Sequence, residues 1–167
     1  MSGGKRAARR ATGGAPGRDD TSAEPRLRVA PSSVHGMGAF AARALPRGTF
    51  LGFYEGRRYP AAEAATRDWS AQLGYLAMLS NGDVIDGADG GNATRFLNHS
   101  CAPNCEAFET VDAAGRPAFR FQTLRAVMAG EELFVDYELA ADDGTTGADH
   151  PCHCGAPTCR GTLLAPI

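Results

Sequence analysis

The sequence predicts a mainly β fold, built from short strands and many turns, in one folded domain. Glycine and proline are abundant, with 21 and 10 among 167 residues, and both favour turns over helix interiors. The apolar runs between the turns are short, and none approaches the length of a membrane-spanning helix. A hydrophobic content of 43% is ordinary for a chain with a real core.

Residues 1–25 are predicted to form a disordered basic tail, because they contain almost no large apolar side chain. The first 26 residues carry six basic and three acidic groups, whereas the remainder carries 11 and 16. A basic partner or a merely solvated surface explains this distribution equally well. The piece Ala11–Arg18 resembles part of a core-histone tail, although chance explains that likeness more simply. No apolar segment follows the basic residues, so no classical secretory signal is expected.

Order is expected to begin near Leu27 and to continue as strands separated by turns. A loop is expected at 32–38, a short helix after Pro60 at 61–68, one helical turn at 92–97 and a polar linker at 140–149. The predicted strands span 27–29, 39–44, 49–54, 72–79, 84–86, 105–110, 117–126 and 133–135. The hairpin that joins 105–110 to 117–126 turns at Ala114 and Gly115.

The C-terminal region contains a compact cysteine motif. Cys152, Cys154 and Cys159 place three thiols within eight residues, and a tetrahedral zinc ion needs four nitrogen or sulfur ligands. Candidates for the fourth ligand are Cys101, Cys105, His150 and His153. Free thiols or a disulfide are the alternatives. Five cysteines are few for a disulfide scaffold, and an odd number leaves one unpaired, which favours a reducing compartment.

A second unusual stretch runs from Arg95 to Cys105. It mixes Asn98, His99, Ser100 and Asn104 with apolar residues in a pattern that fits neither a helix stripe nor a strand alternation. These polar groups are interpreted as placed to hold a ligand.

The motifs together resemble the SET-domain protein lysine methyltransferases with a C-terminal post-SET zinc motif. The resemblance is carried, in chain order, by Gly36–Met37–Gly38 with Phe40–Arg43, Arg95–Cys105, Gly130–Tyr137 and Cys152–Gly161. It covers about Arg26 to Thr162. It implies small β-sheets around a pseudoknot, in which the segment ending at Tyr137 passes beneath a loop. The implied organisation is a SET domain at 26–139, a linker at 140–149 and a post-SET zinc segment at 150–167.

The resemblance also implies S-adenosylmethionine as the methyl donor. The implied cofactor-binding residues are Gly36, Met37, Gly38, Tyr75, Arg95, Asn98 and His99. Glycines let the backbone approach a ligand closely, and the cofactor's carboxylate and ammonium need fixed partners. Arg95 faces that carboxylate or forms a structural ion pair. The implied zinc ligands are Cys101, Cys152, Cys154 and Cys159, which leaves Cys105 as a small core residue.

Tyr137 corresponds to the family's catalytic tyrosine. Methyl transfer to an amine needs a neutral nucleophile, and an apolar channel lowers the pKa of a lysine. The tyrosine hydroxyl and nearby carbonyls would then align the lone pair with the methyl group. Tyr75 resembles the tyrosine that lines this channel, and Tyr54 is a weaker candidate. Tyr137→Phe is therefore predicted to keep the fold and lose methyl transfer.

The sequence departs from the family pattern at several places. Met37 stands where many members have an aromatic residue. Val135 stands where relatives often have Phe or Tyr, a position that influences how many methyl groups are added. A cysteine-rich pre-SET segment is absent from the sequence. The residues after Cys159 lack an aromatic, so Leu163 or Leu164 is expected to cover the cofactor instead.

The resulting interpretation is a protein lysine methyltransferase whose partner is a basic protein or peptide, such as a histone or another DNA-packaging protein, in the bacterial cytosol or the nucleus. The alternatives are an inactive SET-like module that binds peptides and a zinc-stabilised nucleic-acid-binding protein. The intact Tyr137 argues against the inactive module. The acidic body argues against nucleic-acid binding by any part of the chain other than the basic tail. No membrane association is expected. Lys5, the sole lysine, is a candidate for automethylation.

Overall fold

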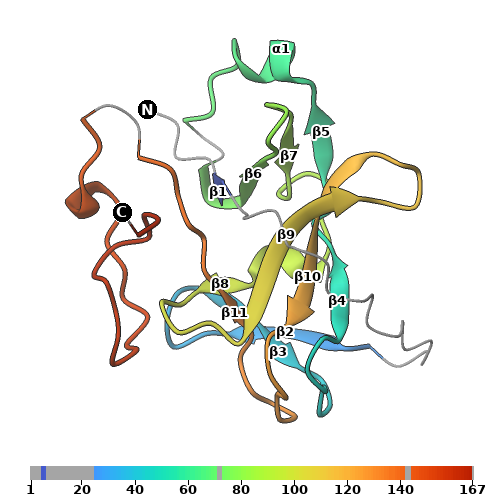
Figure 1. Ribbon diagram of the computed structural model, residues 1–167, viewed down its shortest axis with the longest axis vertical. Coiled ribbons are helices and arrows are strands. Elements are labelled where there is room, and N and C mark those ends of the chain that lie inside the picture. The colour runs from blue at the N-terminus through green and yellow to red at the C-terminus, as the bar shows by residue number, and fades with distance from the viewer. Residues whose placement is uncertain (1–4, 7–24, 71–72, 142–143, 167) are drawn as a thin grey trace.

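The computed structural model describes residues 5–6, 25–70, 73–141 and 144–166. It confirms a mainly β fold with few helices (Figure 1). The helical elements are α1 (Ala61–Ala64) and three 3-10 turns, η1 (Leu73–Tyr75), η2 (Ala93–Phe96) and η3 (Gly147–Asp149). No helix in the described ranges has the length and apolar character that crossing a membrane requires.

Within the described residues the strands form four small sheets rather than one large sheet. The largest has the order β1-β6-β7-β5, from Lys5–Arg6, Leu76–Met78, Val84–Asp86 and Arg57–Tyr59. A second has the order β4-β10-β9, from Phe50–Phe53, Pro117–Thr123 and Cys105–Val111. The remaining pairs are β2 (Leu27–Pro31) with β3 (Met37–Ala41), and β8 (Asn98–His99) with β11 (Phe134–Val135).

The parallel pairing of β8 with β11 brings the two polar motifs together. Phe134 lies opposite Asn98 and Val135 opposite His99. The amide of Ser100 extends this pairing by donating to the carbonyl of Val135 at 3.0 Å. The segment that ends at Tyr137 therefore lies against the stretch around Asn98, as the expected pseudoknot requires.

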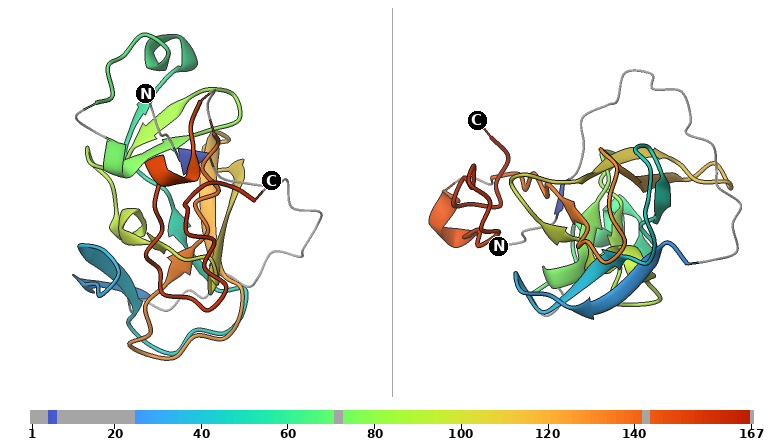
Figure 2. Two further views of the ribbon diagram at one scale, coloured as in Figure 1. Left: turned by 90° about the vertical axis from the view of Figure 1, so that its left-hand side faces the viewer. Right: turned by 90° about the horizontal axis from the view of Figure 1, so that it is seen from below.

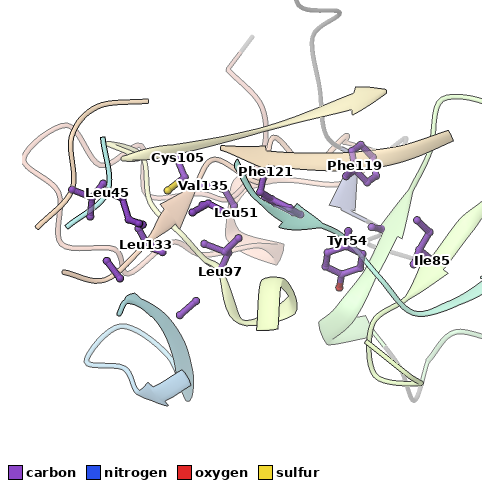
Figure 3. Packing of buried hydrophobic residues seen from close by; sticks show 14 of the residues in the cluster. Leu45, Leu51, Tyr54, Ile85, Leu97, Cys105, Phe119, Phe121, Leu133 and Val135 are labelled. Carbon is purple, nitrogen blue, oxygen red and sulfur yellow. The ribbon is translucent and has the colours of Figure 1, made fainter. Parts of the chain in front are cut away.

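The main core lies between the sheets (Figure 3). In that view Tyr54, Phe119 and Ile85 lie at one end and Leu45 at the other. Cys105, expected as a small core residue, is fully buried in this cluster. A smaller cluster joins α1 to the largest sheet and contains Tyr59, Ala64, Trp69, Leu76 and Val84.

The C-terminal segment stands apart from the sheets, on the side of β8 and β11 (Figures 1 and 2). An isolated β-bridge between Leu139 and Leu164 joins this segment to the body. A second bridge, between Pro151 and Thr162, lies within the segment. Within the expected linker 140–149, η3 is closed by a capping box in which Asp149 accepts from the amide and hydroxyl of Thr146.

Several elements differ from the sequence-based expectation. Lys5–Arg6 form β1 within the segment expected to be disordered, and the rest of that tail lies outside the described residues. The expected strand 72–79 begins with η1 before β6. Strand β8 lies within a stretch that showed no strand alternation, because it has only two residues and its partner β11 is far away in the sequence.

Candidate functional site

A cavity of about 340 Å³ lies between the body and the C-terminal segment. This volume lies within the usual range for small-molecule sites. Segments that are far apart in the sequence line it: residues 34–37, 74–75, 95–96, 98–99, 151–154, Tyr137 and Leu163. Because no single element forms its wall, the cavity exists only when the chain is folded and the C-terminal segment is in place.

Most of the residues expected to bind a cofactor meet in this cavity. They are Gly36, Met37, Tyr75, Arg95, Asn98 and His99. Gly38 does not line it. A Cβ atom on Gly38 would lie 2.2 Å from Oε1 of Glu132, so this glycine lets the chain pack closely against Glu132. Leu163, expected to cover the site, does line it.

Asn98 fixes the loop that carries Gly36. Its Nδ2 lies 3.2 Å from the carbonyl oxygen of His35 and 3.1 Å from that of Met37. The same nitrogen lies 3.1 Å from Oε1 of Glu132. Gly36 itself has a φ of +49°, a left-handed conformation that glycine adopts at little cost. The side chain of Asn98 therefore holds the protein's own loop and shapes one wall of the cavity.

His99 connects the cavity to Tyr137 and to the cysteines. Its Nδ1 accepts from the backbone N–H of Tyr137 at 3.1 Å, and its Nε2 lies 3.3 Å from Sγ of Cys101. These contacts assign the ring proton to Nε2. Burial lowers the pKa of His99 to about 4, with Arg160 acting in the same direction and Asp136 opposing it. A neutral imidazole can accept from Tyr137 and so hold the backbone at that residue.

Arg95 places a guanidinium at the cavity wall. Its Nη1 donates to the carbonyl of Gly87 at 2.9 Å, and its guanidinium carbon lies 4.7 Å from the Phe96 ring centroid and 5.8 Å from that of Tyr75. Its Nε is buried without a hydrogen-bond partner in the structure. The Nε atoms of Arg26, Arg67 and Arg160 share this property, so the feature particular to Arg95 is the position of its side chain at the cavity wall.

A second, narrower cavity of about 30 Å³ adjoins the first and shares Tyr137 with it. Its walls are largely apolar and come from core strands: Tyr54, Ala77, Thr94, Leu97, Ala107, Phe119, Phe121, Val135, Asp136 and Tyr137. The Tyr137 hydroxyl donates to the carbonyl of Leu97 at 2.9 Å. Burial raises the pKa of Tyr137, so the hydroxyl stays protonated at neutral pH.

Tyr54 lines the narrow cavity, whereas Tyr75 lines the larger one. The Tyr54 hydroxyl donates to the carbonyl of Tyr75 at 2.6 Å, and the Gly87 amide donates to the same carbonyl at 2.9 Å. A Cβ atom on Gly87 would lie 2.6 Å from that hydroxyl, so glycine is needed there. Tyr54, which the sequence ranked lower because no motif surrounds it, therefore shares the narrow cavity with Tyr137, whereas Tyr75 shares the larger one.

The four cysteines expected to bind metal come together. The sulfur atoms of Cys101, Cys152, Cys154 and Cys159 all lie within 4.8 Å of one another. Tetrahedral zinc with Zn–S bonds of about 2.3 Å places sulfurs roughly 3.8 Å apart, so this group fits the ion after a small contraction. Burial opposes ionisation of Cys154, but the N–H groups of Cys101 and Ala156 and the adjacent thiols lower its pKa to about 6.

The other candidate ligands lie outside this group. Neither His150 nor His153 belongs to the four-sulfur cluster. His153 lines the larger cavity instead. Burial raises the pKa of Cys105 to about 12, as expected for a core thiol with no role in metal binding.

Asp136 and Arg160 link the cysteine cluster to Tyr137. Nη1 and Nη2 of Arg160 donate to Oδ2 and Oδ1 of Asp136 at 2.6 and 2.9 Å, and Nη2 also reaches the carbonyl of Leu164. The backbone N–H of Arg160 lies 3.4 Å from Sγ of Cys101. The sequence analysis missed this pair. Its signal was an arginine directly after Cys159 and a carboxylate directly before Tyr137.

Residues 36–138, which are more than half of the chain, match the protein family described as SET domain. The match begins at Gly36 in the larger cavity and ends just after Tyr137. It therefore contains every residue that lines the narrow cavity, and all that line the larger cavity except Val34, His35 and the C-terminal residues.

Similar proteins include several much longer chains. The "Histone-lysine N-methyltransferase, H3 lysine-4 specific" of Schizosaccharomyces pombe is 35% identical over 143 residues, 82% of this chain and 15% of that protein. The "Histone-lysine N-methyltransferase 2B" of Homo sapiens is 33% identical over 133 residues, 77% and 5% of the two chains. The Saccharomyces cerevisiae "Histone-lysine N-methyltransferase, H3 lysine-4 specific" is 32% identical over 137 residues, 79% and 12%. The chain thus spans 5 to 15% of the length of these relatives.

Proposed function

The chain belongs to the SET-domain family, and from that premise we propose that it is a protein lysine N-methyltransferase that uses S-adenosylmethionine. The relatives named as histone-lysine N-methyltransferases support a histone or another basic protein as its substrate. The observation that carries the proposal is that two cavities of different character meet at Tyr137. One is large and polar enough for a cofactor, and the other is narrow and apolar.

The larger cavity is the proposed cofactor site. Its residues fit the cofactor because the positively charged side chain of Arg95 lies at the wall and suits a carboxylate, and because Gly36 and Met37 bring the backbone close to the cavity. Asn98 and His99 act mainly by fixing the surrounding backbone, since their side chains bind His35, Met37 and Tyr137. Bound S-adenosylmethionine supplies an electrophilic methyl group on a sulfonium sulfur.

The narrow cavity is the proposed channel for the substrate lysine. An apolar wall suits an unbranched alkyl chain, and it lowers the pKa of the amine by disfavouring the ammonium. Tyr137 and the carbonyl of Leu97, already joined by a hydrogen bond, are placed to orient the neutral amine. Positioning of this kind supplies much of the catalysis in a displacement reaction.

Tyr54 and Tyr75 form one positioning unit in this proposal. The hydroxyl of Tyr54 holds the carbonyl of Tyr75, so one side chain faces the channel and the other the cofactor site. Tyr75 therefore acts at the cofactor, and Tyr54 takes the channel role that the resemblance gave to Tyr75.

The cysteine cluster is the proposed zinc site, with Cys101, Cys152, Cys154 and Cys159 as ligands. A zinc ion with four protein ligands is structural. It would hold Pro151–Cys154 against the larger cavity, which those residues line. The acidic body favours a basic partner, and histone-like substrates favour the nucleus or, in a bacterium, the cytoplasm.

The test is methyl transfer from labelled S-adenosylmethionine to mixed histones or a cell extract. We expect labelled protein with the wild-type chain and none with Tyr137→Phe, while both variants bind the cofactor in calorimetry. Cofactor binding without transfer to any protein would instead support an inactive binding module. Failure to bind the cofactor would overturn the assignment of the larger cavity.

A further inference from the structure

The edge of the largest sheet is occupied by the chain's own N-terminal segment. Strand β1 pairs in parallel with β6, with Lys5 opposite Ala77 and Arg6 opposite Met78. Strands β1 and β6 lie side by side (Figures 1 and 2). Strand β6 has β7 on its other side, so β1 covers an edge that would otherwise be open to an extended peptide. Adding a strand to such an edge is a common mode of peptide recognition.

This edge belongs to the wall of the proposed lysine channel. Ala77, the partner of Lys5 in the strand register, lines the narrow cavity together with Tyr54 and Tyr137. Tyr75, directly before β6, lines the larger cavity. A peptide that pairs with β6 is therefore held beside the point where the two cavities meet.

The segment on this edge has the chemistry of a substrate. Lys5 is the sole lysine of the chain, and Arg6, Arg9 and Arg10 follow it closely. The body from residue 27 onward is acidic, with 16 acidic and 11 basic residues.

We propose that the N-terminal segment docks on β6 of its own chain as an intramolecular substrate, and that Lys5 is methylated there. This inference rests on the proposed function. In the reaction, a bond forms between Nζ of Lys5 and the methyl carbon as the bond from that carbon to the sulfonium sulfur breaks. The cofactor leaves as a neutral thioether, and the amine releases its proton to solvent. While docked, the segment also competes with any external peptide for the same edge.

Tethering favours reaction within one molecule. Eighteen residues separate Arg6 from Pro25, where the described body begins. Covalent linkage of two binding partners commonly gives an effective concentration in the millimolar range, so docking within one chain needs little intrinsic affinity.

The first experiment incubates the 167-residue chain with labelled S-adenosylmethionine alone, followed by mass spectrometry. We expect methylation at Lys5, with a rate per molecule that does not change when the protein is diluted tenfold. Lys5→Arg and Tyr137→Phe should each abolish the label. A rate that falls in proportion to dilution would overturn docking within one chain.

A matched pair of variants tests the strand pairing. Arg6→Pro removes a backbone N–H and disfavours a strand, whereas Arg6→Ala keeps the backbone and removes the same charge. We expect Arg6→Pro to slow Lys5 methylation about tenfold, on the order of one lost hydrogen bond, and Arg6→Ala to slow it clearly less. Amide exchange at 76–78 should rise in Arg6→Pro only. Equal effects of both variants on rate and exchange would show that the strand pairing has no role.

A separate reaction with mixed histones distinguishes failure of the proposed function from failure of the Lys5 inference. Histone methylation with an unmodified Lys5 would overturn this inference and leave the proposed function intact. Absence of methylation on both would overturn the proposed function and the inference with it. Histone methylation by Arg6→Pro should not fall, because its undocked segment no longer competes.

Discussion

The two cavities that meet at Tyr137 are built in different ways. Tyr54, Leu97, Phe119, Phe121 and Val135 line the narrow cavity and also belong to the main hydrophobic core. The larger cavity is walled instead by short segments at 34–37, 74–75, 95–96 and 98–99 and by the C-terminal segment at 151–154 and Leu163. The narrow cavity therefore forms with the core, whereas the larger one also needs the C-terminal segment to be held against the body.

This difference means that the two cavities should fail under different perturbations. Loss of the cysteine cluster should open the larger cavity and leave the core folded. A change at Tyr137 affects the point that both share. Substitutions of the core residues that line the narrow cavity should change the stability of the fold and the shape of that cavity together.

The largest expected effect is that of Tyr137→Phe. We expect methyl transfer to histones to fall at least about 100-fold, because loss of one positioned polar group in a reacting centre commonly costs that much. The fold and the cofactor dissociation constant should be unchanged, since the ring remains packed. Turnover, calorimetry and thermal unfolding measure these three quantities, and turnover near the wild-type value would refute the role of the hydroxyl.

Loss of zinc should have the next largest effect, and it should affect the larger cavity but not the narrow one. In Cys101→Ser, Cys152→Ser, Cys154→Ser or Cys159→Ser, we expect less bound zinc by metal analysis and cofactor binding weaker by at least about tenfold. A chelator should act in the same way. The core should stay folded, because none of its packing depends on the ion.

Cys105→Ser is the matched control for the cysteine series. It should keep full zinc, although burying a hydroxyl in the core costs about 1–3 kcal/mol of unfolding free energy. Full zinc in Cys101→Ser, combined with loss in His150→Ala or His153→Ala, would reject the assigned ligand set.

Arg160→Ala should weaken the contact between the C-terminal segment and the body, but less than the loss of zinc does. It removes a two-pronged, partly buried pair with Asp136, which lies beside Tyr137, and we expect a loss of about 1–3 kcal/mol in unfolding free energy. Cofactor affinity should fall several-fold, since Arg160 joins the C-terminal segment to the body. Denaturant unfolding and calorimetry measure both.

Arg125→Ala provides the comparison for Arg160→Ala. Arg125 pairs with Glu131 but is 57% exposed, against 23% for Arg160, and exposed pairs contribute roughly 0–1 kcal/mol. Equal losses in the two variants would indicate that Arg160 is an ordinary surface residue.

Tyr54→Phe should have only a small effect on stability and on turnover. It removes the hydrogen bond to the Tyr75 carbonyl, which keeps the Gly87 amide as a second donor. We expect a loss of about 0.5–1.5 kcal/mol, and a fall in turnover well below that of Tyr137→Phe. A fall as large as that of Tyr137→Phe would make Tyr54 a partner of equal weight at the reacting centre.

Much of this architecture was predictable from local sequence patterns. The hairpin of β9 and β10 forms around Gly115 as expected, and Asn92 caps η2 through an acceptor bond from the Thr94 amide. The short strand β8 and the strand β1 were not predictable. Both are set by a partner strand far away in the sequence, and neither has an alternating apolar face.

The roles of individual polar side chains were harder to predict than their presence. Asn98 was expected to contact a ligand, but its amide holds the carbonyl oxygens at His35 and Met37. Gly38 was expected at the cofactor and instead makes room for Glu132. Residue type and spacing show that a polar group is needed, but its partner depends on which segments the fold brings near it.

The sequence by itself determined the fold class and the three C-terminal cysteines of the cluster, because each depends on residue types at fixed local spacing. Only the tertiary structure decided that Cys101 joins them, that Tyr54 lines the narrow cavity and Tyr75 the larger one, and that Arg160 pairs with Asp136. It also decided that Lys5 lies on the edge of β6. These are contacts between segments separated by 20 to more than 70 residues, and such contacts arise from packing rather than from local preference.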